Sequence, residues 1–178
     1  MELKEGLPWP LGMKAWIRTR SPDTFRFDRQ TGRMVHLDEA EVAAQPHTWQ
    51  LVLFHPGPDR RYLPDSHFLE PWMVDWLIQN IPLAMERYRQ IEPELPKSVT
   101  TSSTLTGRAN LGSGQYTDVE LEVRVHDAVD GVLLLPRARW SNTAAIRSDA
   151  EARSVINALE KARMRGAELA AKAQRLTF

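Results

Sequence analysis

The chain has 178 residues, 42% of them hydrophobic, and its 23 basic and 23 acidic side chains give a formal net charge of zero. This length and composition suit one folded domain, which we expect over residues 1–178. The absence of cysteine excludes disulfides, cysteine-ligated zinc and thiol nucleophiles. No secretory signal pattern or apolar run of membrane length is present, so we expect a cytoplasmic protein without a membrane partner.

The first third of the chain predicts strands. Residues 13–20 (MKAWIRTR) have the alternation of a strand, and residues 47–54 (HTWQLVLF) have the composition of a short buried one. Between them, residues 24–37 predict a hairpin, because apolar and polar residues alternate on both sides of a turn at Gly32.

The segment FHPGPDRRYLPDSHF, residues 54–68, follows these strands. Imidazole and carboxylate groups together can bind metals or perform acid–base catalysis. The three prolines, however, favour an extended connection, and the histidine spacing is not that of a helical metal motif. We expect a loop without a catalytic role, with Asp65 capping the helical segment that follows. Two alternatives stay open: a metal or acid–base site using His55, Asp59, Asp65 or His67, and a binding loop using Arg60, Arg61 and Tyr62.

The middle of the chain predicts a helical segment and then an edge strand. Apolar residues repeat at helical spacing over residues 68–91. Pro71 suits a first helical turn, whereas Pro82 predicts a kink or a division into two helices. Residues 97–116 are rich in Thr, Ser and Gly, and predict an edge strand followed by a mobile loop.

Residues 116–140 predict a second hairpin, with its turn at Asp130 and Gly131, because Asp-Gly is a strong two-residue turn signal. This turn would place apolar residues opposite each other on one face and charged residues on the other. The expected pairs are Val123 with Ala138, Leu121 with Trp140, and Glu122 with Arg139.

The last segment predicts a long helix over residues 149–175. Ser148 and Glu151 form the pattern of a capping box, in which each side chain satisfies a backbone N–H group of the first turn. The apolar stripe of this helix contains the small residues Ala162, Gly166 and Ala173. Small residues would let another element approach closely, so we expect tight docking of the helix there.

The C-terminal part of the chain has an excess of positive charge: residues 137–178 contain nine Lys or Arg and four Asp or Glu. Such an asymmetry is typical of a partner-binding or nucleic-acid-binding region, although a solvated helix face has the same composition. The candidate binding residues in this part are Arg137, Arg139, Trp140, Lys161, Arg165, Lys172 and Arg175.

Together these elements predict an α+β fold in which one antiparallel sheet of about five to seven strands packs against a Pro-kinked helical segment (68–91) and a long C-terminal helix (149–175). No catalytic residue, metal ligand or cofactor is assigned. We expect a non-catalytic protein-interaction or assembly subunit, whose partner is another subunit or a second copy. The alternatives are a nucleic-acid-binding accessory protein that uses the basic C-terminal region, and a metal-dependent enzyme that uses the 55–67 loop.

Overall fold

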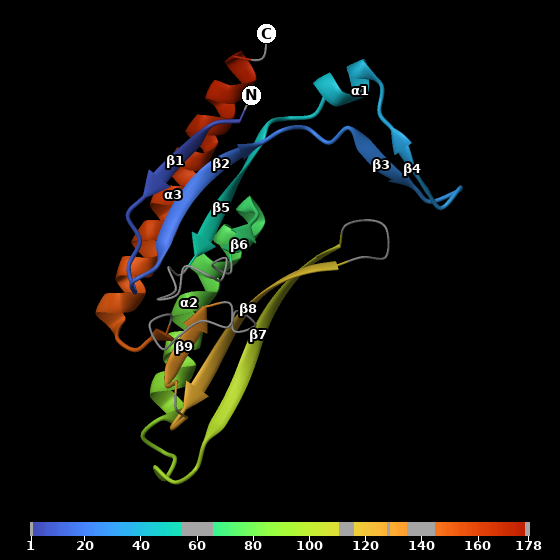
Figure 1. The fold of residues 1–178 in the computed structure, drawn as a ribbon. Helices are drawn as coiled ribbons and strands as arrows, with labels where there is room; N and C mark the ends of the chain where they lie inside the picture. Colours follow the sequence, from blue (N-terminus) through green and yellow to red (C-terminus); the bar gives the residue numbers. More distant parts are fainter. Residues whose placement is uncertain (1, 55–65, 111–115, 128, 135–144, 177–178) are drawn as a thin grey trace, which may run out of the picture.

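The computed structural model describes residues 2–54, 66–110, 116–127, 129–134 and 145–176. In this part of the chain, four antiparallel strands followed by a long helix occur twice in succession (Figure 1). The first run consists of β1 (Lys4–Leu7), β2 (Lys14–Arg20), β5 (Thr48–Phe54), β6 (Ser66–Leu69) and α2 (Pro71–Ile91). The second run consists of β7 (Thr101–Asn110), β8 (Tyr116–Val125), β9 (Gly131–Leu134), β10 (Ala145–Ile146) and α3 (Asp149–Leu176).

The strands form two four-stranded sheets, which corrects the prediction of one sheet of five to seven strands. The first sheet has the order β1-β2-β5-β6, and the second has the order β10-β9-β8-β7. The 21-residue helix α2 separates β6 from β7 in the chain and carries the backbone across to a new layer. The second run of strands therefore begins a sheet of its own.

Each long helix covers the sheet built by the other run. Helix α2 follows the first sheet in sequence but packs mainly against β7, β8 and β9, whereas α3 follows the second sheet and packs against β2 and β5. The two helices also pack against each other. Buried residues from both sheets and both helices consequently form one contiguous cluster. None of the helices in the described residues is long and apolar enough to span a membrane.

Two glycines set how closely these layers approach. Gly166 of α3 lies against the indole ring of Trp49 in β5, and a Cβ atom at position 166 would overlap that ring. Gly107 of β7 lies in the same way against Trp76 of α2, where a Cβ would sit 2.6 Å from Nε1. The expected close docking of the last helix is thus confirmed, with a sheet as its partner.

The start of α3 confirms the predicted cap with one difference. The Ser148 hydroxyl accepts a hydrogen bond from the Glu151 N–H at 3.1 Å. The Glu151 carboxylate reaches back to the Arg147 N–H at 2.9 Å, one residue before the N–H expected for a capping box.

Helix α2 confirms some of the predicted features and corrects others. Pro71 does occupy the first turn, but the N-cap position belongs to Glu70, and Asp65 lies outside the described residues. Strand β6 takes the residues just before the helix. Pro82 lies inside one continuous helix, so the division into two helices is wrong. Proline removes one backbone donor, and buried side chains on both sides of it, such as Ile81 and Met85, keep the helix docked.

The register predicted for the second hairpin is wrong. Val123 pairs with Val132 instead of Ala138, which lies outside the described residues. The chain turns earlier, where His126 adopts a left-handed conformation with φ 58°. Gly131 is the first residue of β9, and a Cβ there would lie 2.5 Å from the Ile146 carbonyl oxygen. The partner of each β8 residue is shifted by six positions along the chain relative to the prediction. Because six is an even number, every β8 side chain keeps its predicted face.

The first hairpin is confirmed, and it stands apart from the two sheets. Strands β3 (Phe25–Asp28) and β4 (Arg33–His36) form a two-stranded sheet that turns through Gly32 at φ 68°. Together with α1 (Glu39–Ala43) it makes a projecting module inserted between β2 and β5 (Figure 1).

We predict that Gly166→Ala lowers the free energy of unfolding by about 1–3 kcal/mol, because the new methyl group must displace the buried Trp49 ring. This loss should outweigh the roughly 1 kcal/mol of helix propensity that alanine gains over glycine. Urea unfolding monitored by circular dichroism measures the difference. Gly6→Ala is the matched control, since a Cβ at Gly6 has no atom within 4 Å. Equal stability of the two variants would contradict the close contact.

Candidate interaction surface

The first sheet has two different faces. Trp49, Leu51 and Leu53 of β5 alternate toward α3 and the core, as the contact between Trp49 and Gly166 shows. Successive side chains of a strand point to opposite faces. The intervening residues of β5, including Val52 and Phe54, therefore lie on the outer face, away from α3.

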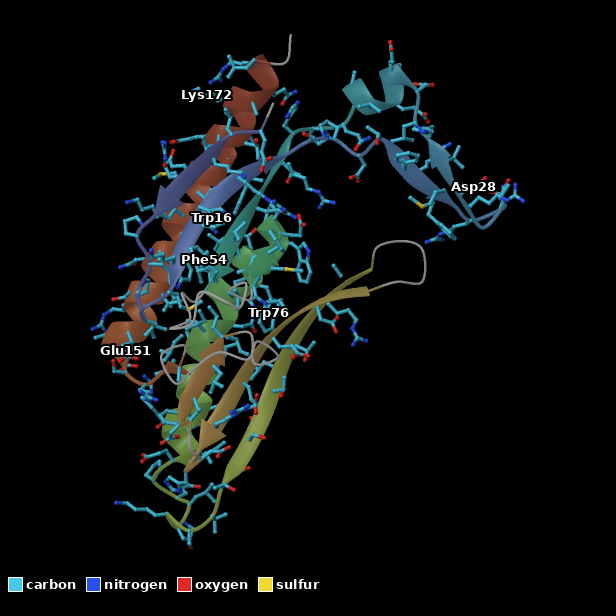
Figure 2. All side chains as sticks on the ribbon, in the orientation of Figure 1. Trp16, Asp28, Phe54, Trp76, Glu151 and Lys172 are labelled. Carbon is cyan, nitrogen blue, oxygen red and sulfur yellow. The ribbon has the colours of Figure 1, made fainter. Side chains whose placement is uncertain are left out.

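Aromatic side chains from three strands gather on this outer face. The strand pairing places Trp16 of β2 and Phe68 of β6 on either side of Val52. The Trp16 and Phe54 rings lie side by side, with centroids 4.6 Å apart (Figure 2). Trp16 is 36% exposed and Phe68 48%, whereas Val52 beneath them is 1% exposed and is not part of the main core. We call Trp16, Val52, Phe54 and Phe68 the aromatic face.

A network of polar side chains, held by mutual hydrogen bonds, borders the aromatic face. The Arg18 guanidinium donates two hydrogen bonds to Gln50 Oε1, at 3.1 and 3.0 Å, and lies 4.5 Å from the centre of the Phe68 ring. Gln50 Nε2 donates to Glu70 at 2.5 Å, and Arg20 donates to the same oxygen at 2.9 Å. Each long side chain is held by its neighbours, so this surface is ordered in the protein alone.

The surroundings of the aromatic face carry an excess of positive charge. Lys4 and Lys14 join Arg18 and Arg20 on the outer side, because the strand pairing aligns Lys4 with Arg18 and Lys14 with Phe54. Three carboxylates oppose these four cations: Glu70 and Asp23, which both pair with Arg20, and Glu2, which lies 3.7 Å from Lys4. The net excess is one positive charge on one face of a chain whose total charge is zero.

A pocket of about 550 Å³ adjoins the aromatic face. Trp16 and Phe54 form one side of it, and Trp9, Met13 and Lys14 are among its other lining residues. The indole Nε1 of Trp9 is buried and has no hydrogen-bond acceptor in the described structure. The pocket thus combines apolar walls with the ammonium group of Lys14.

The basic stripe predicted on the C-terminal helix is partly neutralised. Arg165 donates two hydrogen bonds to Glu5 of β1, at 2.8 and 2.7 Å, and also pairs with Glu168. The Arg165 guanidinium lowers the pKa of Glu5, and the two carboxylates raise the pKa of Arg165. Lys161, Lys172 and Arg175 are exposed. The structure does not bring them together with the aromatic face.

The other predicted binding residues lie outside the described part of the chain, as do three candidate metal or acid–base residues. They are Arg60, Arg61, Tyr62, Arg137, Arg139, Trp140, His55, Asp59 and Asp65. His67 is described and pairs with Leu53 across β6 and β5, which places it on the core side of the sheet. Among the described residues, no group of three or more His, Asp or Glu side chains could hold a metal ion.

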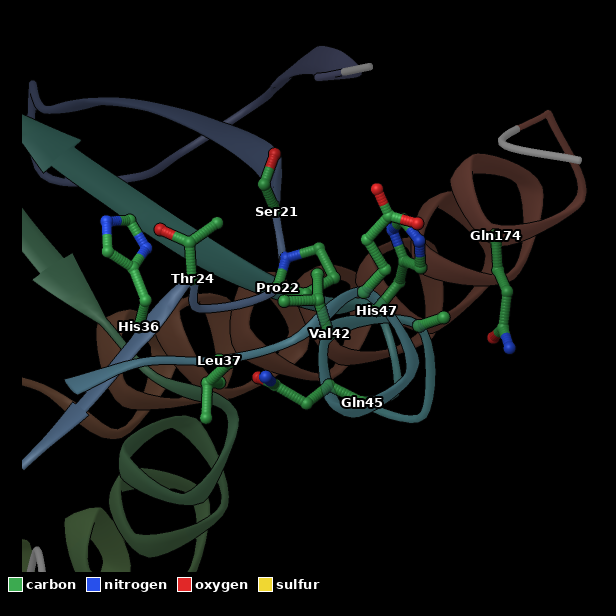
Figure 3. Close-up of a pocket in the computed structure, with 11 residues that line it drawn as sticks. Ser21, Pro22, Thr24, His36, Leu37, Val42, Gln45, His47 and Gln174 are labelled. Carbon is green, nitrogen blue, oxygen red and sulfur yellow. The ribbon is translucent and has the colours of Figure 1, made fainter. Parts of the chain in front are cut away.

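A larger pocket, of about 630 Å³, lies between the linkers of the projecting module, α1 and the last turn of α3 (Figure 3). Pro22, Leu37 and Val42 give it apolar walls, and His36 and His47 are among its polar groups. Its volume falls in the range of small-molecule sites. The lining does not point to one ligand class as clearly as the aromatic face does.

Tyr88 of α2 is a poor candidate for acid–base chemistry. Burial, together with the nearby Asp130 carboxylate, raises its pKa to about 12. The phenol therefore stays protonated well above neutral pH and supplies no base under ordinary conditions.

Comparison with protein-family models, curated proteins and solved structures finds no match for this chain. The assignment of a site therefore depends on its geometry alone. The aromatic residues that define it, Trp16, Phe54 and Phe68, were not among the predicted binding residues. The signal in the sequence was the unbroken apolar run of β5, in which Val52 and Phe54 are apolar on the face opposite Leu51 and Leu53.

We predict that Glu5→Gln removes part of the acid dependence of stability. The folded-state pKa of Glu5 is below its ordinary value of 4.5, so its contribution is present above that value and disappears as the pH falls through the folded pKa. The stability difference between wild type and Glu5→Gln should thus be largest near neutral pH and shrink in acid. Urea unfolding over a pH series measures it.

Glu86→Gln is a suitable control for this experiment, because Glu86 is an exposed carboxylate that makes no ion pair in the described structure. A Glu5→Gln difference that stays constant into acid would show that the pair with Arg165 does not contribute to stability in solution.

Proposed function

We propose that this protein is a non-catalytic interaction subunit that binds another protein through the aromatic face. The observation that carries the proposal is the row of Trp16, Val52 and Phe68, with Phe54 beside it, on a sheet face that neither long helix covers. Tryptophan, aromatic residues and arginine are enriched in protein interfaces, and especially among the residues that dominate binding energy. Contiguous exposed apolar patches on otherwise polar surfaces are typical of such sites.

The pre-ordered polar border also supports protein binding. Arg18 and Gln50 are already fixed by mutual hydrogen bonds, so a partner loses less side-chain entropy on binding than it would against free side chains. The border can supply specificity through hydrogen bonds at the rim while the aromatic rings exclude water at the centre. This division between an apolar centre and a polar rim is the usual anatomy of an interface.

Nucleic-acid binding is the competing proposal, since aromatic rings on a sheet can stack against bases. Two observations favour protein instead. The Arg18 guanidinium covers one face of the Phe68 ring, so a base cannot stack on that face. Arg165 on the basic flank of α3 forms ion pairs with Glu5 and Glu168, so its charge is already neutralised. The remaining positive excess on the aromatic face is small for a surface that must bind a run of phosphates.

We predict that the double substitution Trp16→Ser and Phe68→Ser abolishes partner binding and leaves the fold intact, because both side chains are exposed and lie outside the main core. The full chain would be used to capture proteins from its native host, and the captured protein would be identified, purified and titrated calorimetrically. Wild type should bind it with defined stoichiometry, and the double variant should lose at least about tenfold in affinity.

Phe27→Ser provides the control, since Phe27 is an equally exposed aromatic residue on the projecting module, at 47%. If Phe27→Ser weakens binding and the double variant does not, the interaction surface is the module and not the aromatic face.

A further inference from the structure

We infer that the pocket beside Gly6 is an anchor site for an apolar side chain from an acidic segment of the partner polypeptide. This inference rests on the proposed function, because it specifies what kind of partner segment the aromatic face accepts. Its evidence is the shape of the pocket, the chemistry of its lining and the charge around it.

The pocket exists because Gly6 has no side chain on the outer face. Gly6 of β1 pairs with Trp16 of β2, and a large ring opposite a glycine often folds over it. Here the Trp16 ring turns to Phe54 instead, with centroids 4.6 Å apart. A Cβ placed on Gly6 would have no atom within 4 Å, so the space is open.

The lining selects for an apolar group. Trp9, Met13 and Trp16 provide apolar walls, which favour burial of an aliphatic or aromatic side chain.

The surrounding charge selects for acidic residues next to the anchor. Lys14 lines the pocket, makes no ion pair in the described structure, and lies on the face with one excess positive charge. Carboxylates that flank the anchor would meet Lys14 and, farther along, Arg18. A second copy docked face to face would instead place like charges opposite each other, so the favoured occupant is a different, acidic polypeptide.

A substitution series at Gly6 tests the anchor site directly. The probe is an amphipathic peptide of about 15 residues, containing Leu, Ala and Glu, which is long enough to form a helix on binding. The same peptide with Lys in place of Glu is the charge control, and an oligothymidine strand of similar length tests for nucleic acid. Each probe is titrated calorimetrically into the full chain at low and at physiological salt.

We expect the acidic peptide to bind wild type and the Gly6→Ala variant with similar affinity, and to lose at least about tenfold with Gly6→Leu, whose side chain fills the pocket. Neither variant should be destabilised, because the added side chain enters open space on a strand. Lys14→Glu should also weaken the acidic peptide, and the basic peptide should bind more weakly than the acidic one to wild type.

Several results would overturn the inference. One is that the acidic peptide fails to bind wild type at all, or binds Gly6→Leu with unchanged affinity. Another is that wild type binds the basic peptide or oligothymidine more tightly than the acidic peptide. A third is that wild type self-associates in a way that Gly6→Leu abolishes. If Gly6→Leu retains the captured partner and the substitutions at Trp16 and Phe68 lose it, the anchor site fails while the proposed function stands.

Discussion

The close contact between Gly166 and Trp49 is the constraint on which the arrangement of the layers depends. A glycine in a helix is unfavourable on its own by about 1 kcal/mol relative to alanine, so its place here needs a packing reason, and the buried indole ring supplies one. Gly107 of β7 lies against Trp76 of α2 in the same way, so a glycine–tryptophan contact also sets the approach of these two elements. Because each helix docks mainly on the sheet of the other run, the two runs share one core.

The packing of each helix on the other sheet also explains why neither long helix covers the aromatic face. Helix α3 occupies one side of the first sheet, and α2 is committed mainly to the second sheet, so no long helix remains for the outer side. A sheet can keep one face in water when that face is polar. Here Trp16, Phe54 and Phe68 occupy it instead, and Val52 is buried beneath them without joining the core. That combination is costly in an isolated protein, which is the physical basis of the proposed partner binding.

Local features were predictable from the sequence because they depend on neighbouring residues. Capping and turn residues predict the cap at Ser148 and the hairpin at Gly32. Helical spacing of apolar residues predicts the small-residue stripe of α3. The register of β8 was not predictable, since a shift of an even number of residues preserves every face and the alternation cannot detect it. The aromatic face was missed for a related reason: the apolar run of β5 indicates burial, and only the placement of α3 shows which of its two faces is covered.

The distribution of charge gives the clearest contrast between the two sheets. On the outer side of the second sheet, Arg108 pairs with Asp118 and Arg124 with Glu122, at 2.9 and 2.8 Å, so its charges are largely matched within the chain. On the outer side of the first sheet, Lys14 has no such match beside exposed aromatic rings. Exposed ion pairs contribute little to stability, whereas an unmatched cation next to an apolar patch contributes to the rate and selectivity of association. A net charge of zero therefore conceals one outer surface with matched charges and another with an unmatched lysine in the described structure, and this difference is the basis of the proposed acidic partner.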